Sequence, residues 1–347
     1  MKIQDVLVVG GGPVGLVAAI EARLAWLTVT LIEPHAGVLD KACGEGLMPG
    51  ALPFLERLGV KPHGADLMGV RYQNQGHAVV HRFSSGPGRG VRRTALHKAL
   101  LERAQELGVS FKHSLLTSLS QSEDLVSVGC EDGETLQGKF LIGADGIHSR
   151  VAKEAGMARA IAPRKTKRFG IRQHFAIAPW SDLIEVFYTK NAEVYVTPVS
   201  ESEIGVAILG PKNTDYLATI EAVPELKQRL QGIPISSKRA GAGSFPQETK
   251  SRRKGRVLLV GDASGYVDAI TGEGLRLGFA QANLAVGLIA TGQTERYERG
   301  WRKVSRNFRI LTRGLVVLAN SRLRFAIVPL SARFPALFGF VVERLAR

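Results

Sequence analysis

Cysteine is nearly absent from this chain, because only Cys43 and Cys130 occur among its 347 residues. Two thiols are too few for a disulfide framework, which indicates a reducing compartment. No uncharged apolar run reaches the ~18 residues that a membrane-spanning helix needs. The first residues enter a β-branched segment without the organisation of a signal peptide. These absences predict a cytoplasmic, soluble protein.

Acidic side chains are also scarce: 31 Asp and Glu stand against 46 Lys and Arg, a formal net charge of +15. Such an excess raises the question of nucleic-acid binding. However, the chain has no nucleic-acid motif and no aromatic residues interleaved with basic ones, so no nucleic-acid partner is expected. The histidines lack the spacing of metal ligands, and we expect no metal.

Much of the basic excess lies in residues 301–347, which carry Glu343 as their one acidic residue. Apolar patches alternate with arginines there, and we expect a basic, apolar helical C-terminal segment. It could be a capping helix pair with a solvated basic face. It could also contact an anionic membrane surface, with arginines at the headgroups, or an acidic carrier protein.

Glycine is abundant, at 39 residues, and the first cluster of glycines has a recognisable spacing. Gly10-x-Gly12-Pro13-x-Gly15 follows a buried strand at 6–9 and opens a helix that runs to about residue 24. The glycines allow a tight turn, close approach of a pyrophosphate, and close packing of helix on strand. Glu33 ends the next strand, where its carboxylate would accept hydrogen bonds from ribose hydroxyls. This pattern predicts FAD or NAD rather than NADP.

Two later motifs select FAD. They are Asp145-Gly146 after the apolar run 140–142 and Gly261-Asp262 after the run 256–260. With these motifs, and with Arg93 in Arg-Thr-Ala-Leu between the glycine turn and Asp145, the sequence resembles the flavoprotein superfamily of para-hydroxybenzoate hydroxylase, geranylgeranyl reductase and flavin-dependent halogenases. The resemblance implies that Asp145 and Gly146 lie near the pyrophosphate, Asp262 on the ribityl chain, and Arg93 against FAD.

Two further segments resemble the prenyl reductases of that superfamily: residues 41–47, with Cys43 and Gly44, and 271–275, with Gly272, Glu273 and Gly274. The second would begin a helix whose N–H groups face the flavin N1–C2=O edge and stabilise anionic reduced flavin. In the segment 193–198, Tyr195 stands where the reductases carry Trp. We expect Cys43 to be a packing or pocket-lining thiol, since no Cys-x-x-Cys pair is present.

His174 and Tyr195 are the candidate catalytic residues. His174 lies on a strand expected to line the substrate side, and its side chain suits proton transfer near neutral pH. The alternative is a hydrogen-bonded strand histidine without a catalytic role. Tyr195 is a candidate for contacting a substrate oxygen.

The fold class expected is α/β, a Rossmann-type, glutathione-reductase-like FAD-binding domain with an inserted antiparallel β-sheet that binds substrate. Residues 1–65, 90–155 and 250–300 would form the FAD-binding domain, and 66–89 and 156–249 the substrate sheet. Strands at 193–198 and 203–209 are expected to form a hairpin.

The leading functional hypothesis is an NAD(P)H-dependent monooxygenase that hydroxylates a hydrophobic, phenolic or lipid-like substrate. Without a second dinucleotide fold, NAD(P)H would bind transiently as reductant. One alternative is a geranylgeranyl-reductase-like enzyme that reduces isoprenoid C=C bonds. Another is a flavin-binding protein acting through its basic C-terminus at membranes. The substrate, the choice between NADH and NADPH, and the oligomeric state are left open by the sequence.

Overall fold

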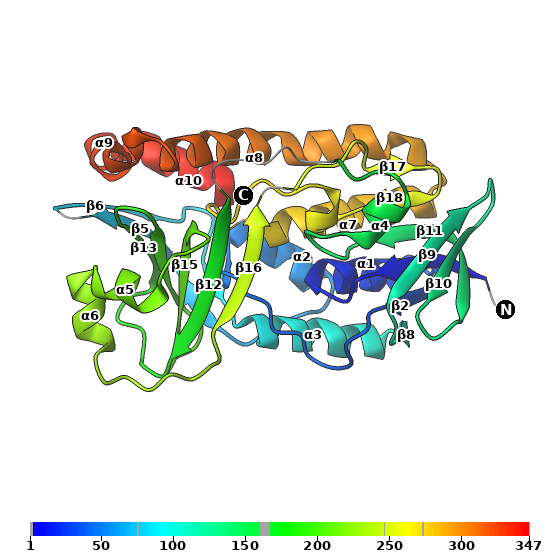
Figure 1. Ribbon diagram of the computed structural model, residues 1–347, viewed down its shortest axis with the longest axis horizontal. Coiled ribbons are helices and arrows are strands. Elements are labelled where there is room, and N and C mark those ends of the chain that lie inside the picture. The colour runs from blue at the N-terminus through cyan, green and yellow to red at the C-terminus, as the bar shows by residue number, and fades with distance from the viewer. Residues whose placement is uncertain (1–2, 75, 160–166, 246, 273, 347) are drawn as a thin grey trace.

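The computed structural model describes residues 3–74, 76–159, 167–245, 247–272 and 274–346. Two large sheets lie at opposite ends of the molecule, with helices between them and along one long edge (Figure 1). The first sheet has eight strands: β1 (Gln4–Val9), β2 (Val29–Ile32), β8 (Ser110–Lys112), β9 (Leu116–Gln121), β10 (Val126–Cys130), β11 (Thr135–Gly143), β17 (Arg253–Lys254) and β18 (Val257–Leu259).

The centre of this sheet is parallel, as expected of a dinucleotide fold. β1 pairs in parallel with both β2 and β11, and β11 pairs in parallel with β18. The strand from the end of the fold, β18, therefore lies in the same sheet as the strand that begins it. β10 pairs antiparallel with β11, and the two strands form a hairpin around Asp132-Gly133.

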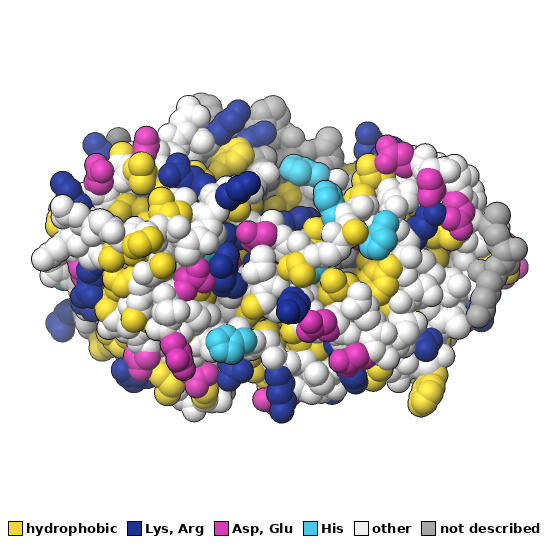
Figure 2. Space-filling model, turned by 90° about the horizontal axis from the view of Figure 1, so that it is seen from below, with side chains coloured by type: hydrophobic (Ala, Val, Ile, Leu, Met, Phe, Trp, Pro, Cys, Tyr) yellow, Lys and Arg dark blue, Asp and Glu magenta, His cyan; other side chains and the backbone are white. Residues whose placement is uncertain are grey.

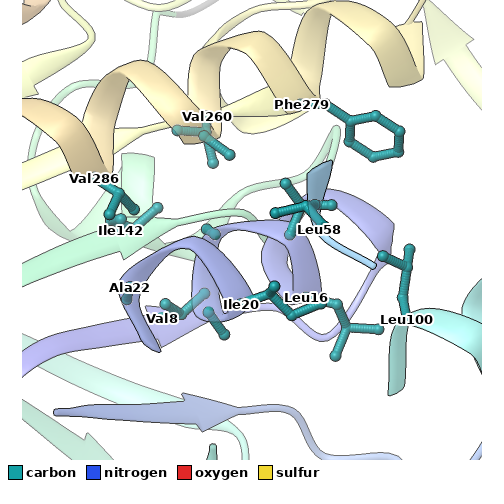
Figure 3. Packing of buried hydrophobic residues seen from close by; sticks show 14 of the residues in the cluster. Val8, Leu16, Ile20, Ala22, Leu58, Leu100, Ile142, Val260, Phe279 and Val286 are labelled. Atoms are coloured by element: carbon teal, nitrogen blue, oxygen red, sulfur yellow. The ribbon is translucent and has the colours of Figure 1, made fainter. Parts of the chain in front are cut away.

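Helices pack on both faces of the first sheet. Figure 3 shows Leu16 and Ile20 of α1 (Pro13–Leu24) packed with Val260 and with Phe279 of α7 (Gly274–Ala290). These side chains are fully buried, as are the β-branched residues of β1 beneath them. This core holds the beginning of α1 and the beginning of the late segment next to each other. α2 (Leu52–Arg57) and α3 (Arg93–Glu106) also border this core, whereas α4 (Arg150–Glu154) packs on the other face of the sheet.

The second sheet has seven strands in the order β16-β12-β15-β14-β13-β5-β6. The hairpin expected at 193–209 is confirmed by the antiparallel pairing of β14 with β15. One junction differs from the antiparallel expectation, since β13 pairs with β5 in parallel because the two come from separate parts of the chain. The strands are β5 (Gly69–Asn74), β6 (His77–Arg82), β12 (Arg168–Phe175), β13 (Leu183–Tyr188), β14 (Glu193–Pro198), β15 (Ile204–Pro211) and β16 (Ala240–Phe245).

Short elements join the two sheets. A three-stranded sheet forms in the order β3-β7-β4 next to residues 41–47. Its strands are β3 (Gly46–Leu47), β4 (Ala65–Leu67) and β7 (Gly88–Gly90), and the remaining short elements are α5 (Tyr216–Glu221), α6 (Pro224–Leu230), η1 (Pro49–Ala51), η2 (Gly261–Ser264) and η3 (Thr294–Arg296).

The C-terminal part is more extensively helical than a short capping pair. α8 (Tyr297–Ala319) runs along the edge of the molecule, followed by η4 (Arg322–Ala326), α9 (Ile327–Arg333) and α10 (Pro335–Ala346) (Figure 1). A buried ion pair ties it down, with Arg324 Nη2 2.6 Å from Glu193 Oε1 on β14. Within the described chain, no single helix has the length and hydropathy of a membrane span. Thr294–Ala319 and Leu323–Arg333, bent by 109°, pass that test only as a pair.

Candidate functional site

The glycine turn between β1 and α1 is shaped for a phosphate group. Gly10 has φ +105°, and an added Cβ there would lie 2.5 Å from the carbonyl oxygen of Ala144. A Cβ at Gly15 would overlap the carbonyl oxygen of Gly10. At Gly12, by contrast, no heavy atom lies within 4 Å of the position a Cβ would take. Pro13 occupies the first turn of α1, so the open backbone of Gly12 lies at a helix N-terminus, where anions bind.

Glu33 lies at the end of β2, against this turn. Its Oε2 accepts a hydrogen bond from Gly11 N at 2.7 Å, and its Oε1 lies 2.9 Å from His35 Nδ1. Burial acts to raise the pKa of Glu33, but the hydrogen bonds from Gly11 and His35 outweigh it, so the pKa is lowered. The ionised carboxylate is a hydrogen-bond acceptor next to the turn, as ribose hydroxyls require.

The backbone of Ala144 and Asp145 packs directly on Gly10, and Ala144 N donates to Val9 O at 2.8 Å. The Asp145 carboxylate accepts from Ser149 Oγ at 2.6 Å and from Val151 N at 2.9 Å. Burial raises its pKa, against these hydrogen bonds. Asp145 is thus engaged with the start of α4 and shapes the loop. Gly146 has φ +82° and no heavy atom within 4 Å of an added Cβ.

The Gly261-Asp262 segment lies against the start of α1. Gly261 has φ +58°, and an added Cβ would lie 3.2 Å from Val14. Gly261 N donates to Gln281 Oε1 at 2.8 Å. The Ser264 hydroxyl lies 3.1 Å from the same oxygen and accepts from Trp301 Nε1 at 2.9 Å. Neither Gln281 nor Trp301 belongs to a sequence motif, so the sequence did not predict their role here.

Arg93 and Asp262 supply opposite charges near the glycine turn and the Gly261-Asp262 segment. Arg93 begins α3, and its Nε and Nη1 are buried without a hydrogen-bond partner among the described residues. Burial raises the pKa of the partly exposed Asp262 to about 6, although the charges of Arg93 and Lys41 lower it. Unused guanidinium donors, a carboxylate acceptor and the open backbone at Gly12 fit the phosphates and the ribityl hydroxyls of FAD.

His97 is a further residue of this site that the sequence did not single out. It lies one helical turn after Arg93, on the same face of α3. Its Nε2 lies 2.7 Å from Gly11 O, and its Nδ1 lies 3.4 Å from Leu39 N. Burial lowers the pKa of His97, so the neutral ring donates from Nε2 to the glycine turn. The spacing Arg93-x-x-x-His97 was the available signal.

The segment containing Cys43 and Gly44 is anchored to the second sheet. Cys43 is a free, partly exposed thiol whose sulfur accepts from Glu45 N at 3.4 Å. Gly44 O accepts from Thr197 Oγ1 at 2.9 Å. The segment therefore lies between the domain that contains the glycine turn and strand β14.

Glu45 links the two sheets through a buried carboxylate. It has φ +59°, which is uncommon for a residue with a side chain, and it is 4% exposed. One oxygen accepts from Arg93 N at 2.8 Å, and the other lies 2.6 Å from His174 Nε2. Arg172, 1% exposed, lies 3.7 Å from Glu45 and also pairs with Asp40. Strained residues of this kind concentrate at functional sites.

The polar side-chain atoms of His174 and Tyr195 are both hydrogen-bonded within the protein. His174 is 0% exposed, and its Nδ1 lies 2.7 Å from Ser237 Oγ. This arrangement matches the hydrogen-bonded strand histidine rather than a group that faces a substrate. Tyr195 OH donates to Ile270 O at 3.2 Å, which fixes the loop that precedes α7. Contact of Tyr195 with a substrate oxygen stays a prediction.

The turn before α7 leads into a helix, as predicted, and the structure describes all of its residues except Glu273. Gly272 has φ +69°, and Gly274 is the first residue of α7. Glu273, proposed from the sequence as part of the same turn, lies outside the described residues. An added Cβ at Gly274 would lie 3.5 Å from Tyr266, so the helix begins beside that ring.

We expect Arg93→Met to lower FAD affinity about 10- to 100-fold, the value of one charged hydrogen bond. The apoprotein should keep its melting temperature or gain stability, because buried unpaired donors are removed. Fluorescence titration of apoprotein with FAD and a thermal melt measure the two effects. Arg299→Met, an exposed arginine on α8, is the control. A destabilised apoprotein with unchanged FAD affinity would contradict this role.

We expect FAD affinity to fall as the pH drops through about 6, the pKa of Asp262. Hydroxyl donors favour the ionised carboxylate, so FAD binding should release a proton there. The contribution of Asp262 to the stability of the apoprotein should rise as the pH drops, opposite to the change in FAD affinity. Its folded pKa lies above the unfolded value, so its contribution to stability grows as the pH falls.

Affinity measured across that pH range in wild type and Asp262→Asn tests this linkage. The variant should bind FAD more weakly and lose the part of the pH dependence that Asp262 contributes. An identical pH profile in both proteins would rule out Asp262 as the titrating group.

Comparisons with known proteins agree with this geometry. A family model described as "FAD binding domain" matches residues 4–301. A rifampicin monooxygenase from Streptomyces venezuelae is 26% identical, over 80% of this chain and 62% of that protein. A digeranylgeranylglycerophospholipid reductase from Methanosarcina acetivorans is 29% identical, over 87% and 81%. A menaquinone reductase from Mycolicibacterium smegmatis is 26% identical, over 98% and 90%.

Solved structures show the same fold. The flavin-dependent brominase Bmp2 superposes with a TM-score of 0.84 at 17% identity, covering 99% of this chain and 94% of the other. The anhydrotetracycline hydroxylase OxyS from Streptomyces rimosus has a TM-score of 0.75 at 22% identity, covering 99% and 76%. The chain spans 66% and 62% of the lengths of two curated relatives that it matches.

These matches confirm the resemblance inferred from the motifs, the α/β fold and FAD as the family's cofactor. NAD(P)H as reductant stays a prediction. The family model covers most of the chain, and the glycine turn, the carboxylates and Arg93 fit FAD. The protein therefore belongs to the FAD-binding domain family of FAD-dependent oxidoreductases.

Proposed function

We propose that the protein is an NAD(P)H-dependent FAD monooxygenase that hydroxylates a hydrophobic, phenolic or lipid-like substrate. The observation that carries the proposal is the chemistry of the contact between the second sheet and the loop before α7. Apolar and phenolic side chains from both elements pack together there, namely Tyr195, Leu209, Ala242, Tyr266, Ala269 and Ile270. A substrate bound against this cluster would meet a largely apolar and aromatic surface, which favours a substrate of the same character.

The ionisable groups near this contact are paired with each other. Arg168 binds Glu193, which is 0% exposed, and lies 3.7 Å from Asp268. Burial raises the pKa of Tyr188 and Tyr195 well above the ordinary value, so both stay neutral phenols. The described residues include no group of three His, Cys, Asp or Glu side chains that could hold a metal. Bound FAD would supply the redox and oxygen chemistry, and the chain would bind the substrate and exclude water.

Hydroxylation is favoured by two points. Tyr195 stands where the prenyl reductases carry Trp, and a rifampicin monooxygenase is among the relatives. Reduction of an isoprenoid C=C bond is the second candidate. Its support is that the menaquinone reductase and the digeranylgeranylglycerophospholipid reductase match over most of both chains.

Oxygen uptake during turnover separates the two reactions. The flavin-loaded protein would be supplied with NADH or NADPH and, separately, a long-chain alkylphenol and geranylgeraniol. A monooxygenase should consume one O₂ for each alkylphenol hydroxylated, with the product identified by mass spectrometry. A saturated isoprenoid formed without stoichiometric oxygen uptake would replace the monooxygenase proposal by the reductase. If neither substrate stimulates NAD(P)H oxidation while the flavin is bound, the non-catalytic flavin-binding alternative would be favoured.

A further inference from the structure

The C-terminal helices present a large apolar surface to solvent. We define the C-terminal surface as the exposed large apolar side chains of residues 310–340. They come from α8, η4, α9, α10 and the residue that joins the last two, and these helices lie along one edge of the molecule (Figure 1). Half of the eighteen large apolar side chains that are exposed in the described chain belong to it, each 39–68% exposed: Ile310, Val317, Leu318, Leu323, Phe325, Leu330, Phe334, Leu337 and Phe340. Such a concentration of exposed apolar side chains in one segment points to an interaction site rather than ordinary surface scatter.

The fold itself does not need these side chains. α10 already buries Phe338, Val342 and Ala346 against Leu67 and Val70 of the second sheet's side of the molecule. The inner face of α8 is likewise buried, through Trp301 and Phe308 among others. The C-terminal surface is therefore the outer face of helices whose inner face is already packed.

The charge beside this surface is mainly positive. Arg302, Arg306, Arg309 and Arg313 follow spacings of four, three and four residues, so they form one ridge along α8. Within it, Arg302 lies 3.5 Å from Glu298 and Arg309 donates to Gly265 O at 3.1 Å, whereas Arg306 and Arg313 are exposed. Arg309 and Arg313 line a surface pocket that contains three further basic residues and one acid, Glu248. Glu343, the one acid of residues 301–347, is already engaged, at 2.9 Å from His81 Nε2 and 2.7 Å from Ser84 N.

The opposite face of the molecule looks different. In Figure 2, which views it from below, acidic and basic side chains are interspersed, and the apolar side chains lie among them. The pairing of an apolar surface with a mainly basic ridge is thus a property of the C-terminal helices. It is the composition of helices that lie in a membrane interface.

We propose that the C-terminal surface docks the protein on a bilayer that contains anionic phospholipids. The helices would lie in the plane of the interface, with Phe325, Leu337 and Phe340 among the upper acyl chains. The arginine ridge would lie at the level of the phosphate groups. A second copy of the chain is a poorer occupant, because symmetric pairing would bring together two arginine ridges in which basic side chains outnumber acidic ones. The inference does not depend on the reaction that the flavin carries out.

Sedimentation with vesicles tests the docking. The flavin-loaded full-length chain should sediment with phosphatidylcholine vesicles that contain phosphatidylglycerol, and much less with phosphatidylcholine alone. Arg306→Ala/Arg313→Ala should weaken binding about 25-fold, at roughly fivefold for each arginine. Leu337→Gln/Phe340→Gln should also weaken it. Leu217→Gln, an equally apolar and 52% exposed position on α5, should leave binding unchanged.

Bound flavin absorbance and the melting temperature verify that each variant is folded. Binding that is equal with and without phosphatidylglycerol would overturn the proposal, as would binding insensitive to both double substitutions. Self-association that Leu337→Gln/Phe340→Gln abolishes, without vesicle binding by the wild type, would instead assign the surface to a second copy of the chain.

Discussion

Gly12→Val is expected to lower FAD affinity about 100-fold or more while leaving the apoprotein folded. Gly12 has φ −65° and ψ 172°, a conformation open to any L-residue, and no heavy atom lies within 4 Å of its missing Cβ. The new side chain would occupy the space that the pyrophosphate needs. Losing two hydrogen bonds to a charged group accounts for an effect of that size. The cap of α1 should weaken by no more than about 1 kcal/mol.

Gly15→Ala is the matched comparison, because there the neighbour is the protein itself. Its Cβ would overlap the carbonyl oxygen of Gly10, and backbone cannot move aside as a flexible side chain can. Destabilisation of about 3 kcal/mol or more is expected. Urea unfolding of the apoproteins and FAD titration separate the two variants. If Gly12→Val unfolded the apoprotein, or bound FAD like wild type, the assignment of Gly12 to the cofactor would fail.

Glu45→Ala is expected to destabilise the protein by about 3–5 kcal/mol, the cost of removing one partner from a buried ion pair. Arg172 and His174 would remain buried, and Arg93 N would lose its acceptor. Alanine would also retain the left-handed backbone strain at φ +59°. Because Arg93 begins the helix that faces the cofactor, FAD affinity should fall together with stability.

Equilibrium unfolding in urea measures this effect, with Glu221→Ala as the control at an exposed glutamate of α5. Glu45→Gln should lose less, since it keeps the side chain's shape and one acceptor. A loss below about 1 kcal/mol for Glu45→Ala would show that the buried cluster relaxes around the gap, or that it contributes little.

Two predicted side chains have partners that the sequence did not indicate. Asp145 near the pyrophosphate stays a prediction: its loop packs on Gly10, and its carboxylate is engaged with Ser149 and Val151. His174 was the candidate acid or base, and it is instead enclosed with Glu45 and Ser237. In both cases the sequence identified an important segment, but the direction of the side chain depends on rotamer and packing.

The sequence by itself determined the dinucleotide unit, because strand, glycine turn, helix and second strand are contiguous and each residue's role is local. The hairpins and the late strand were recognisable for the same reason, through the period of their apolar residues. Only the tertiary structure decided how buried charges pair. Glu45 meets His174 across 129 residues, and Glu193 meets Arg324 across 131. A buried charge must find a partner because desolvation is costly, but which partner is near depends on how distant segments pack, and no local pattern encodes it.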